Sequence, residues 1–111
     1  MALNELQKNC VKSIPIKHPT RGDETLLSLL GLNSAAGDLV GMYKKTLYEG
    51  AELPQKAFVD DLCEIIRYVA VAAHAVDVDL ESILREVNER AVKSREAVLA
   101  NRAEDCKGKE E

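Results

Sequence analysis

The feature that most constrains this chain is an apolar stripe that repeats at alternating steps of four and three over residues 54 to 76. Its members are Phe58, Leu62, Ile65, Val69, Ala72 and Val76. This spacing places apolar side chains on one face of an α-helix, so it predicts a long amphipathic helix with a buried seam. Asp61 and Glu64 border the stripe three residues apart, which puts both carboxylates on one side of the helix. Acids at the edge of a buried seam suggest a cation site.

Three further segments carry helical patterns. Residues 2 to 13 predict a short helix that Pro15 ends, and a fourth helix is expected from about Leu80 onwards. The second helix, over residues 24 to 48, has its own apolar stripe of Leu26, Leu29, Leu32, Ala36, Val40, Tyr43 and Leu47. The fold class predicted from these patterns is all-α, a bundle of about four helices.

The expected organisation has three parts. Residues 1–23 form a short helix and a loop, residues 24–100 form the main helical domain, and residues 101–111 are a charged tail that we expect to be disordered. The long apolar stripes offer more surface than one chain of 111 residues covers, so a homodimer or homotetramer is predicted.

Charge and composition exclude several classes of function for this chain. A net charge of -4 with mixed signs argues against binding to a nucleic-acid backbone. Neither a signal-peptide core nor a run of about twenty apolar residues is visible, so we expect a soluble cytoplasmic protein without a membrane partner. The three widely spaced cysteines lack the paired spacing of a zinc site and are expected to be reduced thiols.

A further acid lies on the second predicted helix. Asp38 follows a run of small residues, 33 to 37, where a neighbouring helix can approach closely. A lone aspartate on a helix usually faces solvent, but a close neighbour helix would reach this one. Asp38, Asp61 and Glu64 are therefore the candidate ligands, from two helices that we expect to form a hairpin.

Two stretches of the sequence carry a resemblance to a known family. The run from Gly31 to Lys45, which contains Gly-Asp-Leu-Val and Lys44-Lys45, and the run from Asp60 to Ala70 resemble the MazG family of all-α nucleoside triphosphate pyrophosphohydrolases. Those enzymes carry an E-x-x-E motif on one helix and E-x-x-D on the next. The similarity extends over residues 24 to 95.

The resemblance implies an activity and a set of site residues. It implies Mg²⁺-dependent hydrolysis of a nucleoside triphosphate to the monophosphate and pyrophosphate, with Mn²⁺ as an alternative metal. Three of the four family ligand positions are acidic here, so the catalytic and metal-binding residues are expected to be Asp38, Asp61 and Glu64. Weaker candidates for contacts to the nucleotide are Lys44, Lys45, Asn88 and Arg95, for which a solvated helix face is the competing interpretation.

One departure from the family pattern leaves two functions open. Ala35 stands where the family has its first glutamate. The chain is therefore either a working, though weakened, pyrophosphohydrolase, or a catalytically inactive member that serves as a helical oligomer or nucleotide-binding module. A helical interaction protein unrelated to nucleotides is the third interpretation.

Overall fold

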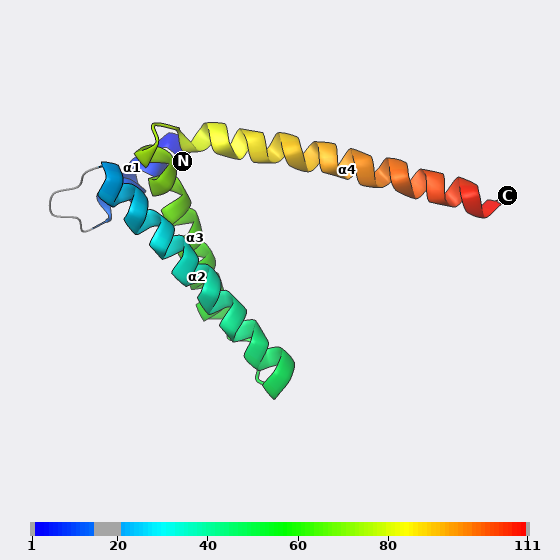
Figure 1. Cartoon of the computed structure of the whole chain (residues 1–111), viewed down its shortest axis with the longest axis horizontal. Coiled ribbons are helices and arrows are strands. Elements are labelled where there is room, and N and C mark those ends of the chain that lie inside the picture. Colours follow the sequence, from blue (N-terminus) through cyan, green and yellow to red (C-terminus); the bar gives the residue numbers. More distant parts are fainter. Residues whose placement is uncertain (1, 15–20, 111) are drawn as a thin grey trace. The chain divides into compact units, whose positions relative to one another are not determined.

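The computed structural model describes residues 2–14 and 21–110, except for the side chains of residues 21 and 107–110. Within these residues the chain forms four α-helices and no strand (Figure 1). The helices are α1 (Leu3–Lys12), α2 (Arg21–Glu49), α3 (Gln55–Ala75) and α4 (Leu80–Glu110). The predicted all-α helical bundle is confirmed. The predicted break at Pro15 lies outside the described residues.

The hairpin of α2 and α3 is the framework of the fold. The two helices run side by side in opposite directions (Figure 1), and they share the more extensive of the two helix interfaces. Gly50 ends α2 with a φ of 69°, in the left-handed region that glycine enters without a steric penalty. A short loop then leads to Pro54, which directly precedes the first residue of α3.

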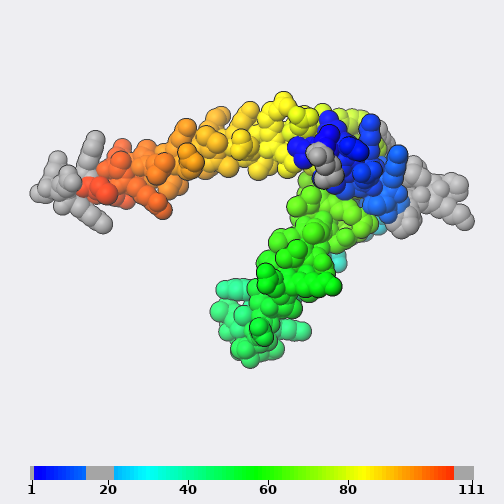
Figure 2. All heavy atoms as spheres, turned by 180° about the vertical axis from the view of Figure 1, so that it is seen from behind, coloured from blue at the N-terminus to red at the C-terminus, as the bar shows by residue number. Residues whose placement is uncertain are grey.

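The small core lies where α1 packs on the C-terminal half of α3. Its buried members are Cys10, Ala70, Val71 and Leu80. Figure 2 shows the blue α1 at this end of the hairpin and the opposite end of the hairpin uncovered by it. Burial raises the pKa of the Cys10 thiol, and the positive charge of Arg67 opposes part of that rise.

Gln7 of α1 joins the segments around this core through three hydrogen bonds. Its buried side-chain amide donates to the carbonyl oxygens of Ala70, at 3.1 Å, and Val78, at 3.0 Å. Its carbonyl oxygen accepts a 3.1 Å bond from the backbone N–H of Leu80. One side chain of α1 thus satisfies backbone groups of α3, of the loop after it and of the residue that begins α4.

The leucine stripe of α2 is not the face that is buried within the chain. Within the chain, the predicted stripe is largely exposed: Leu26 is 59% exposed and Val40 is 60% exposed. The buried residues of α2 are Glu24, Ser28 and Ala35, which lie along another side of the helix. Small side chains on that side let α3 approach closely, whereas a leucine face would hold the two helices further apart. Buried Ala35 belongs to the run of small residues at which a neighbouring helix was expected to approach closely.

Polar side chains also contribute to the α2–α3 contact. The Nδ1 atom of His74, near the end of α3, lies 2.7 Å from the Oε1 atom of buried Glu24 near the start of α2. Ser28 is fully buried and donates a 2.8 Å hydrogen bond to the carbonyl oxygen of Thr25, which satisfies its hydroxyl proton.

The predicted seam of α3 is only partly buried. Leu62 and Val76 are exposed, whereas Ala70, Val71 and Ala73 are buried. Both α1 and α2 contact α3 near its C-terminal end, where these buried residues lie. The stripe therefore predicted the helix correctly but not the full set of buried side chains.

The length and apolar composition of α2 also resemble those of a membrane-spanning helix. The segment Gly22–Glu49 is long and apolar enough to cross a membrane by length and composition alone, with 11% of its most apolar window buried. The sequence prediction expected no such segment. The difference arises because small residues of low polarity separate the leucines, which keeps the mean hydropathy high without a continuous apolar run.

The chain divides into two compact units, residues 1–80 and 81–111. In the second unit α4 continues past Asn101, where a disordered tail was expected. Ala, Arg, Glu and Lys dominate this segment, and these residues have high intrinsic helix propensity. Earlier in α4, two exposed ion pairs each join residues one helical turn apart. They are Arg85 with Glu81 at 2.8 Å and Arg90 with Glu86 at 3.0 Å, and they also favour the helix.

Candidate functional site

The three predicted acidic residues line one pocket. Asp38 of α2 and Asp61 and Glu64 of α3 border a cavity of about 220 Å³. The other lining residues are Gly31, Ser34, Ala35 and Tyr68. The two helices lie side by side, and residues three apart share a helix face, so each helix presents its acids on the side of this cavity.

Asp61 has an unsatisfied oxygen at this pocket. Among the described residues, its Oδ2 atom has no hydrogen-bond partner, and almost none of its surface is accessible to solvent. A buried carboxylate oxygen without a partner is costly, because it has lost its hydration and gained no compensating interaction. A cation or a hydrogen-bond donor that entered the pocket would remove this cost.

Glu64 is paired within its own helix. Its two carboxylate oxygens accept hydrogen bonds from the Nη1 atom of Arg67, at 3.1 and 3.4 Å. The guanidinium of Arg67 also lies over the ring of Tyr68, 5.5 Å from the ring centre. The Arg67 Nε atom is buried and has no hydrogen-bond partner in the described part of the chain. Arg67 does not itself line the pocket, but it contacts two residues that do, Glu64 and Tyr68.

The carboxylate oxygens at this pocket are the type of ligand that a hard divalent cation such as Mg²⁺ prefers. Mg²⁺ is held by few carboxylates together with water and substrate oxygens, and Asp38, Asp61 and Glu64 supply only carboxylates. In the arrangement described, no three Asp, Glu, His or Cys side chains among the described residues are close enough together to hold a metal ion. Glu64 is directed to Arg67, so a cation held by all three acids requires Glu64 to change its side-chain conformation.

Ala35 occupies the wall of the pocket one helical turn before Asp38. It is 5% exposed and presents only a methyl group where the family pattern places a glutamate. The pocket therefore has one carboxylate fewer than the resemblance implies. The wall between α2 and α3 is instead formed by small side chains and the ring of Tyr68.

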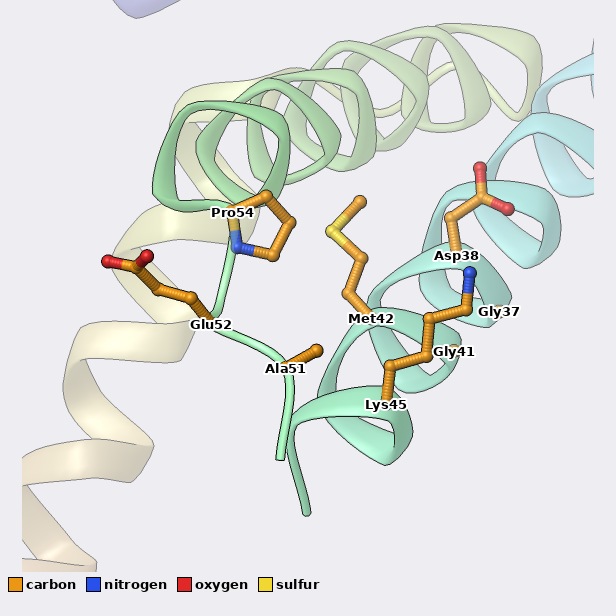
Figure 3. A pocket seen from close by; sticks show the side chains of 8 residues that line it. All are labelled: Gly37, Asp38, Gly41, Met42, Lys45, Ala51, Glu52 and Pro54. Atoms are coloured by element: carbon orange, nitrogen blue, oxygen red, sulfur yellow. The ribbon is translucent and has the colours of Figure 1, made fainter. Parts of the chain in front are cut away.

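A second pocket shares Asp38 with the first. This cavity of about 450 Å³ lies at the other end of the hairpin from α1, and its lining includes Met42 and Lys45 of α2 and Pro54 of the loop (Figure 3). Figure 3 shows the Met42 side chain between α2 and Pro54 and the Lys45 side chain extending back along α2 towards Asp38. An apolar wall and an ammonium group thus lie next to the acidic pocket.

The structure separates the four weaker candidates for nucleotide contacts. Lys45 lines the second pocket, whereas Lys44 is exposed and is not among the lining residues of either pocket. Asn88 and Arg95 are exposed on α4, in the second compact unit, and their position relative to the pockets is not defined.

Sequence reasoning missed two residues at the acidic pocket: Tyr68, which lines it, and Arg67, which pairs with the lining residue Glu64. Arg67 was not singled out, although its position three residues after Glu64 is a signal for an ion pair on one helix face. Tyr68 was also missed, because its role depends on the close approach of α2 at Gly31, a tertiary contact.

Comparisons with protein-family models, with curated proteins and with solved structures find no match to this chain.

Proposed function

We propose that this protein is a Mg²⁺-dependent nucleoside triphosphate pyrophosphohydrolase that converts a nucleoside triphosphate to the monophosphate and pyrophosphate. The observation that carries the proposal is the convergence of Asp38, Asp61 and Glu64 from two helices on one pocket, in which Asp61 keeps an unpaired, buried oxygen. Mn²⁺ has similar ligand preferences and is expected to substitute for Mg²⁺.

The residues of the two pockets have different roles in the proposed binding of metal and nucleotide. Asp61 is the primary ligand, because its Oδ2 atom has no competing partner among the described residues. Asp38 links the two pockets, so a metal-bound triphosphate in the smaller cavity would leave the larger one for the nucleoside. When bound, the metal neutralises phosphate charge and lowers the pKa of a bound water. Lys45 extends towards Asp38 and can contact a phosphate oxygen on the same side.

The test is release of pyrophosphate from the common ribo- and deoxyribonucleoside triphosphates in the presence of Mg²⁺ or Mn²⁺. Asp61→Asn removes the ligand charge with little change in shape and should lower activity by roughly 10- to 100-fold or more. Asp60→Asn is the matched control, because Asp60 is the adjacent residue and is exposed. Equal activity in the two variants, or no pyrophosphate from the parent protein with any substrate, would refute the proposed reaction.

A second candidate function follows from Ala35 and Arg67. The missing fourth carboxylate and the ion pair that engages Glu64 both weaken a metal site, which favours an inactive helical oligomer or nucleotide-binding module. This alternative predicts nucleotide binding, or oligomer formation alone, without pyrophosphate release.

Assembly and location form part of the same proposal. The leucine face of α2 is exposed in the single chain, and exposed apolar surfaces of this kind commonly mark interfaces. We therefore propose a homodimer or homotetramer in the cytoplasm, with the nucleotide as the small-molecule partner and with neither a membrane nor a nucleic acid as a partner.

A further inference from the structure

The exposed face of α2 carries a seven-residue repeat of the kind that pairs two helices. Residues on this face recur at alternating steps of three and four over residues 26–47, and all but one of them are apolar. The members are Leu26, Leu29, Asn33, Ala36, Val40, Tyr43 and Leu47, and we call this set the α2 seam. The five large apolar members are each between 52% and 60% exposed within the chain. A second helix that packs along the seam would bury them.

The α2 seam is complementary to itself when two copies run in opposite directions. In that pairing a two-fold axis passes between Asn33 and Ala36, so each seam residue faces one at the same distance on the other side of the axis. Leu26 then packs against Tyr43 of the second copy, and Leu29 packs against Val40 of the second copy. Large side chains thus meet towards both ends, and the smaller Asn33 and Ala36 lie at the centre, where the helices can approach closely.

The charged residues beside the seam favour the same orientation. Asp23 and Lys44 are exposed, occupy the same position of the seven-residue repeat and flank opposite ends of the α2 seam. The antiparallel pairing places Asp23 of each copy beside Lys44 of the other, which gives two attractive contacts by symmetry. A parallel pairing keeps these residues at opposite ends of the contact and places Lys44 beside Leu39 of the second copy. Charge complementarity therefore selects the antiparallel orientation.

A leucine and a glycine on the same side of the seam also fit this pairing. Leu30 is 57% exposed, and Gly37 leaves open space, because no described atom lies within 4 Å of a Cβ atom built at that position. The antiparallel register sets Leu30 of each copy over Gly37 of the other. Since Gly37 also lines the second pocket, Leu30 of the second copy then borders that pocket.

We propose that two copies of this protein associate by antiparallel pairing of their α2 helices along the α2 seam, with Asp23 of each copy beside Lys44 of the other. This inference rests on the homo-oligomer of the proposed function and not on its reaction. It names what covers the leucine face of α2, the same face of a second copy, and it gives the orientation and register of the pair.

The first experiment determines the orientation by cross-linking, in a protein in which the exposed Cys63 and Cys106 are replaced by serine. Leu26→Cys and Tyr43→Cys are prepared as separate proteins, mixed, and treated with a bismaleimide that has a short spacer. The mixture should give cross-linked dimers. Each protein alone should not, because the antiparallel pairing places the two copies of position 26 roughly 25 Å apart along the helices.

Two results of this experiment overturn the proposal. Cross-linking of Leu26→Cys alone and of Tyr43→Cys alone identifies a parallel pair. Absence of cross-linked dimers from the mixture, with the helices intact by circular dichroism, shows that positions 26 and 43 do not meet.

The second experiment measures the dimer dissociation constant of charge variants by analytical ultracentrifugation. Asp23→Lys and Lys44→Asp should each weaken the dimer roughly 5- to 20-fold, because each creates two like-charge contacts. The double variant Asp23→Lys/Lys44→Asp restores the attraction and should return to within about threefold of the parent. Lys56→Asp, on exposed α3 surface, is the control and should leave the dissociation constant unchanged. A double variant no tighter than the single variants overturns the proposal, because damage to α2 alone is not repaired by a second substitution.

The outcomes separate this inference from the proposed function. A parent protein of two or more chains that fails the cross-linking and charge-exchange tests keeps the homo-oligomer and loses the antiparallel pairing. A monomeric parent protein overturns both, and the hydrolase assignment is then decided by the release of pyrophosphate alone.

Discussion

The ring of Tyr68 lies directly against the backbone of Gly31, so that a Cβ atom at position 31 would overlap the ring carbons. This contact sets how closely α2 approaches α3 beside the acidic pocket, which both residues line. A glycine within a helix costs about 1 kcal/mol relative to alanine. Gly31 therefore lowers the stability of α2 itself, but it allows α3 to approach closely.

Gly31→Ala should therefore destabilise the protein, despite the gain in helix propensity. Inserting a methyl group into a packed contact costs roughly 1–3 kcal/mol, which outweighs the gain of about 1 kcal/mol from alanine. Chemical denaturation measures the difference. Gly41→Ala, in the same helix but with no atom near its added Cβ, should stabilise the protein. Equal effects of the two substitutions would show that the Tyr68 contact does not limit the approach of the helices.

Gln7→Ala should cost roughly 2–4 kcal/mol of unfolding free energy. The substitution removes three hydrogen bonds and leaves the carbonyl oxygens of Ala70 and Val78 and the N–H of Leu80 without the amide partner. Thermal unfolding followed by circular dichroism measures the loss. The exposed Gln55→Ala is the control and should change stability by less than about 0.5 kcal/mol. A similar small effect at Gln7 would mean that water replaces its hydrogen bonds without cost.

The exposed leucine face of α2 should hold copies of the chain together. Light scattering at micromolar concentration should give a mass of at least two chains of 12.2 kDa, and Leu29→Glu combined with Val40→Glu should yield monomers, because it places charges in a desolvated contact. Lys56→Glu on α3 is the control for added negative charge. A parent protein that is monomeric would contradict this prediction, and one that sediments with lipid vesicles would identify a membrane as the occupant of this face.

Ala35→Glu should make the protein more dependent on a divalent cation. The added carboxylate lies one turn before Asp38 on the pocket wall, where it repels the nearby acids in the absence of metal and supplies a further ligand in its presence. The melting temperature without metal should fall, and the increment produced by Mn²⁺ should exceed that of the parent. Saturation at 100 times the dissociation constant corresponds to about 2.7 kcal/mol.

Ala36→Glu is the matched control for that substitution, because Ala36 is the next residue on α2 and is exposed. It should leave the Mn²⁺ increment of the parent unchanged. If Ala35→Glu and Ala36→Glu respond to Mn²⁺ alike, position 35 does not face a cation site.

The thiols offer an independent check of the core. Cys10 is buried with a raised pKa, so less of it is thiolate at a given pH, whereas Cys63 and Cys106 are exposed. Reaction with a thiol reagent at pH 8 should therefore show two fast sites and one slow site. Three equally fast sites would mean that α1 does not stay packed on α3.

The sequence alone determined the secondary structure and the residues that share a helix face. The periodic apolar residues gave the four helices to within a few residues at most ends, and the spacing of Asp61 and Glu64 required both to lie on one side of α3. These properties depend on the 3.6-residue repeat of a single helix, so they can be calculated without knowing any partner.

Only the tertiary structure decided which faces meet. The leucine spacing of α2 defined an apolar face, but within the chain the buried residues are Ser28 and Ala35 on another side, because small side chains allow the close approach in which Tyr68 covers Gly31. The same approach brings Asp38 to the pocket of Asp61. A hydrophobic pattern states that a face will be covered, but the shapes of both surfaces determine what covers it.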